Sequence, residues 1–77
     1  MQYVLQDICI GKNLGYLRRA KGLTQEQLVA KLQLAGSAMS RSTYSKIETG
    51  ERNIKASDIV LLREALGVPL EELFIKE

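Results

Sequence analysis

Hydrogen-bonding side chains recur at helical spacing between residues 40 and 50. If this stretch is a helix, Tyr44, Ile47 and the stem of Glu48 lie on its inward face, and basic and hydroxyl groups lie on its outward face. A helix that only faces water more often carries Glu and Lys pairs. Phosphates and base edges instead require donors and small hydroxyls. The outward residues are Arg41, Ser42, Ser45, Lys46 and Thr49.

This helix has recognisable start and stop signals. Ser40 is a candidate N-cap, and Met39 and Tyr44 stand at the spacing of a hydrophobic staple around it. Gly50 is placed to end the helix. The sequence therefore predicts a short helix that presents its polar face to a partner.

A second short helix precedes it. Thr24 and Gln27 have the spacing of a capping box, and Leu23 can close on Leu28 as a staple. Gly36 is placed to end this helix. Residues 23–50 thus form a pair of helices around which the rest of the chain is organised.

Three further helices are predicted to support this pair. The first runs from about Ile8 to Ala20, and Gly11 and Gly15 inside it each cost roughly 0.5–1 kcal/mol relative to Ala. The four-residue spacing of these glycines would permit another backbone to approach, but it is a weak signal in such a helix. The expected inward residues are Ile10, Leu14 and Leu17, and the outward ones are Lys12, Asn13 and Arg19.

The fourth helix is expected over residues 56–66, ended by Gly67, and Pro69 opens a last short helix. No stretch alternates as a strand does, so the predicted fold is all-α. The residues expected to be buried are Ile59, Leu62 and Leu66, with Val60 or Ala65 alongside, and Leu70, Leu73 and Phe74 below them.

Composition excludes several classes of protein. The chain of 77 residues is long enough for one small domain, and it has no histidine and one cysteine, Cys9, expected to be a small buried hydrophobe. A zinc site, an internal disulfide and His-based catalysis are therefore excluded. The hydroxyl cluster at Ser40, Ser42 and Ser45 has no nearby base. We expect a protein that is not an enzyme and binds no cofactor or metal.

The chain also contains no apolar run of membrane-spanning length and no signal-peptide pattern, which predicts a cytoplasmic protein. Its net charge of +2 is unevenly distributed. Residues 1–50 hold seven basic and three acidic residues, giving +4, whereas residues 51–77 hold four basic and six acidic residues, giving −2. The positive half contains the helix with the polar face, as steering to a phosphate backbone requires.

Several short motifs, taken together, resemble the phage-repressor (Cro/cI, XRE-type) helix-turn-helix family over about residues 10–74. The resemblance implies a compact five-helix lambda-repressor-like DNA-binding domain over residues 9–77, with the helix-turn-helix at about 24–49 and residues 1–8 as a short arm. That arm either packs on the body or a second subunit, or is frayed. The motifs are Ile10-Gly11, Leu17-Arg18, Gly22 to Leu28, Ser40 to Thr43, Ile47-Glu48-x-Gly50, Leu66-Gly67-Val68 and Glu72-Leu73-Phe74.

The resemblance also implies roles for individual residues. Gln25 would contact a backbone phosphate, and Arg18 and Glu48 occupy the positions of a structural ion pair. Arg41 would reach a base edge or, alternatively, contact a phosphate or remain a free surface charge, and Lys46 would contact either the groove or the backbone. The full set implied to contact DNA is Gln25, Ser40, Arg41, Ser42, Ser45, Lys46 and Thr49.

One departure from the family pattern concerns the turn between the two central helices. Residues 33–39 make it longer than the usual three or four residues, as in a subset of the family with an extended turn. Such a turn changes how the following helix sits in the groove. Val29 also replaces the usual Ala, and the connection after Gly50 lacks the proline of many members.

The leading hypothesis is a sequence-specific, double-stranded DNA-binding transcriptional regulator, a prokaryotic or phage repressor. One such domain makes few contacts, so we expect a homodimer on a pseudo-palindromic operator, with half-sites about 34–36 Å apart or a multiple of that distance. The dimer surface would be the C-terminal helix or the N-terminal arm. The alternative hypothesis is a protein-interaction module of the same fold, such as an antitoxin-like partner.

Overall fold

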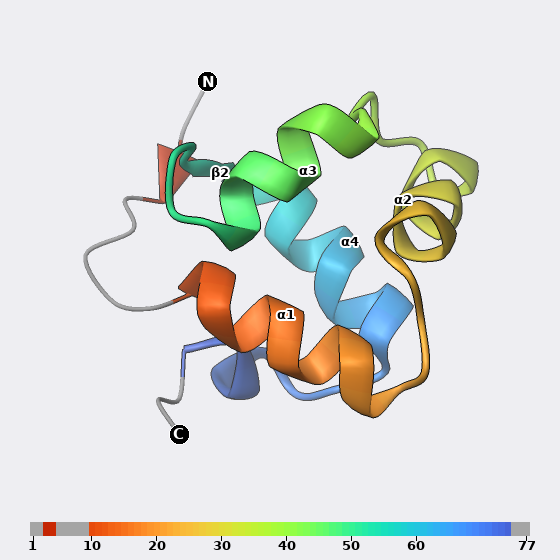
Figure 1. Ribbon diagram of the computed structural model, residues 1–77, viewed down its shortest axis with the longest axis vertical. Coiled ribbons are helices and arrows are strands. Elements are labelled where there is room, and N and C mark those ends of the chain that lie inside the picture. The colour runs from red at the N-terminus through yellow and green to blue at the C-terminus, as the bar shows by residue number, and fades with distance from the viewer. Residues whose placement is uncertain (1–2, 5–9, 75–77) are drawn as a thin grey trace.

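Four α-helices and a short 3-10 helix surround one apolar core in the computed structural model (Figure 1). The structure describes residues 3–4 and 10–74. The elements in chain order are β1 (Tyr3–Val4), α1 (Ile10–Ala20), α2 (Gln25–Leu34), α3 (Arg41–Glu48), β2 (Ile54–Lys55), α4 (Ala56–Leu66) and η1 (Leu70–Leu73).

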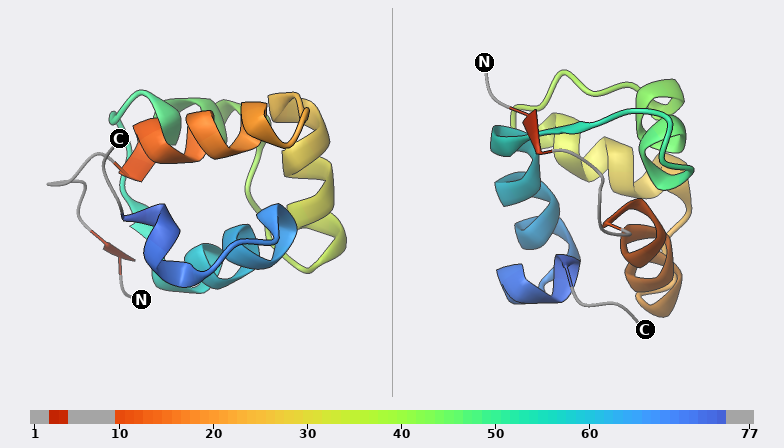
Figure 2. Two further views of the ribbon diagram at one scale, coloured as in Figure 1. Left: turned by 90° about the horizontal axis from the view of Figure 1, so that it is seen from below. Right: turned by 90° about the vertical axis from the view of Figure 1, so that its left-hand side faces the viewer.

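The helices form two sides joined at one end. Figure 2 shows α1 and α3 on one side, α4 and η1 on the other, and α2 across the end between them. Contacts of α2 with both α3 and α4, and of α1 with α3, follow from this arrangement. The side chains of Leu14, Leu28, Tyr44, Leu62 and Leu73 meet in the middle, fully buried. The helix-turn-helix therefore rests on a core to which every helix contributes.

The predicted helix signals act as expected. Thr24 Oγ1 accepts a hydrogen bond from Gln27 N at 3.0 Å, and Gln27 Oε1 accepts one from Thr24 N at 2.9 Å, which completes the capping box. The helix predicted over residues 56–66 has those bounds, and Gly67 ends it with φ of +68°. Only glycine adopts such a left-handed conformation at little cost. The three helices predicted between residues 24 and 66 are therefore confirmed as α2, α3 and α4.

The fifth predicted helix is present only as a single 3-10 turn, η1. The expectation of no strands was wrong, because β1 pairs antiparallel with β2, with Tyr3 opposite Lys55 and Val4 opposite Ile54. Two residues are too few to show a strand period in the sequence. At these two residues the arm packs on the body of the domain. Helix α1 begins at Ile10 in the structure. The predictions for Ile8 and Cys9 fall on residues outside the described part of the chain.

Two burial predictions need correction, and one open alternative is resolved. Asn13, expected to face outward, is buried, and its Nδ2 donates to Leu73 O at 3.2 Å, tying α1 to η1. Leu70, expected in the core, is 45% exposed because the 3-10 turn rotates Leu73 inward instead. Of the two alternatives on α4, Ala65 packs on the core whereas Val60 is exposed.

No helix among the described residues is both long enough and apolar enough to cross a membrane.

Candidate nucleic-acid interface

Helix α3 presents its polar face because its other face is fixed to the core. Tyr44 and Ile47 are buried, and Met39, just before the helix, is buried as well. Ser40 caps the helix by accepting a hydrogen bond from Thr43 N at 3.1 Å. Of the outward residues, Ser45 is half-buried, and the exposed ones are Arg41, Ser42, Lys46 and Thr49.

The two hydroxyls at the ends of α3 have partners within the helix. Ser40 Oγ donates to Thr43 Oγ1 at 3.2 Å, and Thr49 Oγ1 donates to Lys46 O at 3.0 Å. A phosphate oxygen only accepts hydrogen bonds, so each hydroxyl must turn its hydrogen away from its present acceptor to reach a phosphate. The donors at the start and middle of the outward face of α3 belong to Arg41, Ser42 and Lys46.

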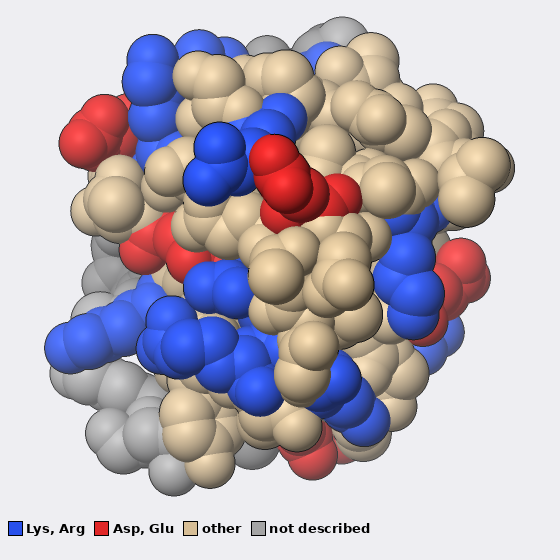
Figure 3. All heavy atoms as spheres, turned by 45° about the vertical axis from the view of Figure 1, so that its right-hand side comes forward, with Lys and Arg blue, Asp and Glu red and all other residues tan. Residues whose placement is uncertain are grey.

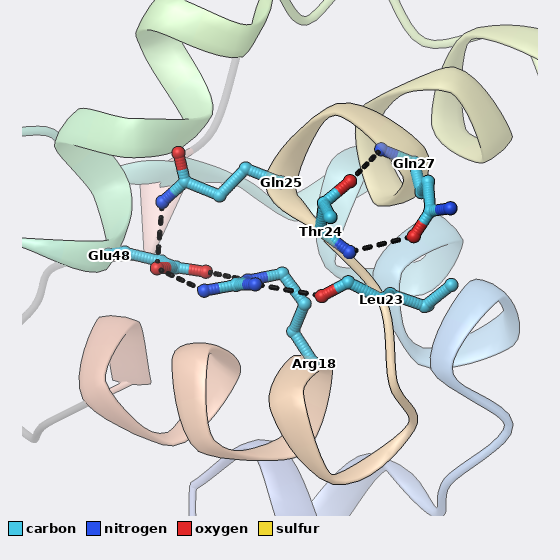
Figure 4. A network of polar contacts seen from close by, with 6 residues as sticks. All are labelled: Arg18, Leu23, Thr24, Gln25, Gln27 and Glu48. Atoms are coloured by element: carbon cyan, nitrogen blue, oxygen red, sulfur yellow. Dashed lines mark hydrogen bonds and ion pairs between the residues drawn. The ribbon is translucent and has the colours of Figure 1, made fainter.

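An ion pair holds the C-terminal end of α3 to α1 (Figure 4). Arg18 Nε lies 2.8 Å from Glu48 Oε2, and the two side chains are only 11% and 10% exposed. Arg18 Nη1 also donates to Leu23 O at 2.8 Å, at the start of the helix-turn-helix. One guanidinium therefore joins the end of α1, the entry to α2 and the end of α3, as the positions of the expected ion pair require.

The charges of this pair stabilise one another. Burial raises the pKa of the Glu48 carboxyl, but hydrogen bonds from Arg18 and Gln25 outweigh burial, and the pKa lies below its ordinary value. The same hydrogen bond to Glu48 raises the pKa of Arg18. Tyr44 lies beside the pair, where burial and then the Glu48 carboxylate raise the pKa of its phenol. Tyr44 Oη is buried, and it has no hydrogen-bond partner among the described residues.

Gln25 belongs to this network, which the sequence did not suggest. Its Nε2 donates to Glu48 Oε1 at 3.0 Å (Figure 4). An amide nitrogen has two hydrogens, so one remains to donate outward from the first turn of α2. The expected phosphate contact by Gln25 is compatible with this geometry. The residues stand 23 positions apart, and no local pattern marks such a contact.

Glycine at position 15 makes room for the network. A Cβ placed on Gly15 would lie 3.3 Å from Glu48 Oε1 and 3.2 Å from Arg19 Nη1, which is closer than ordinary van der Waals contact. The spacing of Gly11 and Gly15 was judged a weak signal of close approach. At Gly15 the approach is real, but the neighbour is a carboxylate side chain and not a backbone.

A shallow hollow of about 510 Å³ lies where the end of α1 and the first turns of α2 and α3 meet. Gln25 lines it, and so do the exposed residues Arg19 and Arg41. Figure 3 shows basic side chains spread across the side of the molecule on which α2 and α3 lie, with smaller acidic groups between them. Arg19 was predicted only to face outward, and its place in the same hollow as Arg41 depends on the fold. This hollow combines the guanidinium groups of Arg19 and Arg41 with the Gln25 amide, and the exposed Glu26 carboxylate lines it as well.

Residues 14–73 match the helix-turn-helix family. The chain belongs to this family. It is therefore a DNA-binding helix-turn-helix regulator of transcription of the XRE type, as the sequence motifs indicated, and its family is not one of enzymes.

Two relatives are similar along most of their length. The chain is 41% identical to an uncharacterized HTH-type transcriptional regulator of Sinorhizobium fredii, with 83% of this chain and 77% of the relative covered. It is 37% identical to the control protein C.MunI of a Mycoplasma species, with 87% and 85% covered.

Solved structures are similar as well. The restriction-modification controller protein C.AhdI of Aeromonas hydrophila superposes with a TM-score of 0.76 at 36% identity, covering 87% of this chain and 94% of that one. A hypothetical transcription factor from Neisseria, NHTF, gives a TM-score of 0.75 at 26% identity, covering 97% and 86%.

Proposed function

We propose that this protein is a sequence-specific regulator that binds double-stranded DNA as a homodimer, with α3 in the major groove of each half-site of a pseudo-palindromic operator. The observation that supports it most strongly is the fixing of α3. Its inner face is buried through Tyr44 and Ile47, its end is held by Glu48, and its outer face carries the exposed donors of Arg41, Ser42 and Lys46. Preorganised donors on a rigid helix are what base readout requires.

Individual roles follow from position along α3. Arg41, at the first turn, reaches base edges, and Ser42 and Ser45 lie near it on the same face. Lys46 lies one turn further along and contacts either the groove or the sugar-phosphate backbone. Gln25, Ser40 and Thr49 contact phosphates at the two ends of the helix-turn-helix.

The hollow beside α3 is a further proposed site of phosphate contact. Arg19 and Arg41 flank the first turn of α2, whose amide groups and helix dipole favour an anion. The backbone of the bound DNA would pass this hollow and place a phosphate there. Binding should consequently weaken as salt rises, because condensed counterions are released when phosphates are neutralised.

The dimer accounts for affinity and for operator symmetry. One helix in one groove makes few contacts, whereas two subunits related by a twofold axis read two half-sites about 34–36 Å apart or a multiple of that distance. The C-terminal turn offers the partly exposed apolar residue Leu70 as part of a dimer surface. We infer repression as the outcome, because a dimer on an operator blocks access to the DNA that it covers.

Two of the similar proteins are a control protein and a restriction-modification controller. Control of a restriction-modification gene set is accordingly the more specific form of this proposal.

A titration of the protein with a randomised duplex pool, at two salt concentrations, tests the proposal. Recovery and sequencing of the bound fraction should yield a short inverted repeat. If no duplex binds at low salt, the DNA-reading role is wrong, and a protein partner for the same surface becomes the explanation.

A further inference from the structure

The extended turn between α2 and α3, residues 35–40, is held by specific hydrogen bonds. Ser37 N donates to Leu32 O at 2.9 Å, and Gln33 Nε2 donates to Met39 O at 2.9 Å. Both bonds tie the turn back to the last turns of α2. A turn of this length without such contacts would leave the start of α3 free to shift.

Ser37 links this turn to a helix outside the helix-turn-helix. Its Oγ donates to Asp58 Oδ1 at 2.9 Å and accepts from Met39 N at 3.0 Å. Met39 is the buried residue that precedes the Ser40 cap of α3. A single hydroxyl therefore connects the first turn of α4 to the residue that precedes the N-cap of α3.

Asp58 is well placed to serve as a fixed acceptor. It is only 9% exposed and lies in the first turn of α4, where the helix dipole stabilises a negative charge. Lys55 occupies the N-cap position of α4 and makes no side-chain capping bond, and Asp58 Oδ1 accepts from Ser37 across the fold.

Packing does not fill the space on this side of α3. A small cavity of about 120 Å³ lies beneath the first turn of α3, bordered by Met39, Thr43, Lys55 and Asp58 among others. Apolar contact is therefore incomplete here. Met39 and Asp58, which border this cavity, are both hydrogen-bonded to Ser37.

We propose that Ser37 and Asp58 are positioning residues for sequence recognition, which set the angle and register of α3 in the major groove without touching DNA. This inference rests on the proposed function. Loss of the link should let the first turn of α3, and with it Arg41, take more than one position. Contacts to base edges depend on that geometry far more than contacts to phosphates do.

The experiment compares four variants, Ser37→Ala, Asp58→Ala, Asp58→Asn and Ile59→Val. Asp58→Asn keeps an oxygen acceptor for the Ser37 hydroxyl, and Ile59→Val trims the core on the same helix without touching the link. Circular dichroism and urea unfolding establish that each variant is folded. Dissociation constants are then measured for the selected inverted repeat and for a random duplex, and their ratio is the specificity.

We expect Ser37→Ala and Asp58→Ala to lower the specificity ratio by about tenfold, comparable to the loss of one base contact. Binding to random duplex should stay within about twofold of the wild type. Asp58→Asn and Ile59→Val should keep the wild-type ratio.

An unchanged ratio in folded Asp58→Ala, or an equal fall in Ile59→Val, would overturn the positioning role. Failure of the proposed function gives a different result, because then the wild-type protein itself would select no sequence.

Discussion

The Glu48 carboxylate receives hydrogen bonds from two other segments of the chain, through Arg18 on α1 and Gln25 on α2. These bonds hold the pKa of Glu48 below its ordinary value, so the folded state favours the ionised form more than the unfolded chain does. The resulting stability is fully present above the unfolded pKa, about 4.3. It is lost as the pH falls through the lower pKa of the folded state.

The first prediction concerns Arg18→Met, which leaves the Glu48 carboxylate without its cation. At pH 7 the free energy of unfolding should fall by about 3 kcal/mol, since the pair is nearly buried. At pH 3 the loss should be smaller, because this pH lies below the ordinary pKa of a Glu carboxyl, and the unfolded chain then binds a proton that the ion pair resists in the folded wild type. Urea unfolding at both pH values measures the difference.

The matched control is Glu64→Gln, which neutralises an exposed carboxylate on α4. It should change stability little at either pH. An equal loss for Arg18→Met at pH 7 and pH 3 would show that the charge of Glu48 is not what Arg18 stabilises.

The second prediction concerns readout by Arg41. Arg41→Ala should weaken binding to the preferred site and relax the preference at one or two base pairs, with a cost of about 1–3 kcal/mol there. Competition with duplexes changed at single positions measures this. Arg63→Ala makes the same change of charge on α4, across the core from α3 (Figure 2), and should leave the preference intact. Uniform weakening on every duplex would instead make Arg41 a phosphate contact.

At the scale of elements, capping residues fix where the two central helices begin. The third prediction is that Thr24→Ala destabilises the protein by about 1 kcal/mol, because it removes one half of the capping box. For a domain of this size the melting temperature should fall by about 4–8 °C. Ser57→Ala, at an exposed position on α4, is the control and should melt near the wild type. A similar melting temperature for Thr24→Ala would mean that tertiary packing alone sets the start of α2.

Helix starts and ends could be predicted because they depend on neighbouring residues. Thr24 and Gln27 lie three positions apart, and Gly67 directly follows the last residue of α4, so each signal is local. The pairing of β1 with β2 and the bond from Asn13 to Leu73 join distant residues. No period in the sequence encodes such contacts, and both were missed for that reason.

Some features of the candidate site could likewise be predicted from the sequence, and others could not. The outward residues of α3 follow from helical spacing, and the pairing of Arg18 with Glu48 was expected only through family resemblance. Three features appear only once the helices are packed. These are the bond from Gln25 to Glu48, the hollow that Arg19 shares with Arg41, and the link from Ser37 to Asp58. Each depends on elements that meet in space and not in sequence.

At the scale of the whole molecule, the fourth prediction concerns self-association through the C-terminal surface. Leu70→Lys should raise the dimer dissociation constant by at least about tenfold, because it places a charge on a partly exposed apolar residue. Leu34→Lys makes the same substitution at a leucine that is 90% exposed on α2 and should leave association unchanged. Sedimentation across a range of concentrations measures both, and a wild-type association constant for Leu70→Lys would leave the N-terminal arm as the dimer surface.

Selection from the randomised duplex pool, with binding measured at about 50 mM and about 200 mM salt, tests most directly whether this protein reads DNA sequence as a dimer. We expect a short inverted repeat to be enriched, and affinity for it to fall by about 10³-fold between the two salt concentrations if about six phosphates are contacted by the dimer. Binding that is insensitive to salt, or a bound fraction with no preferred sequence, would contradict a dimeric reader of DNA sequence.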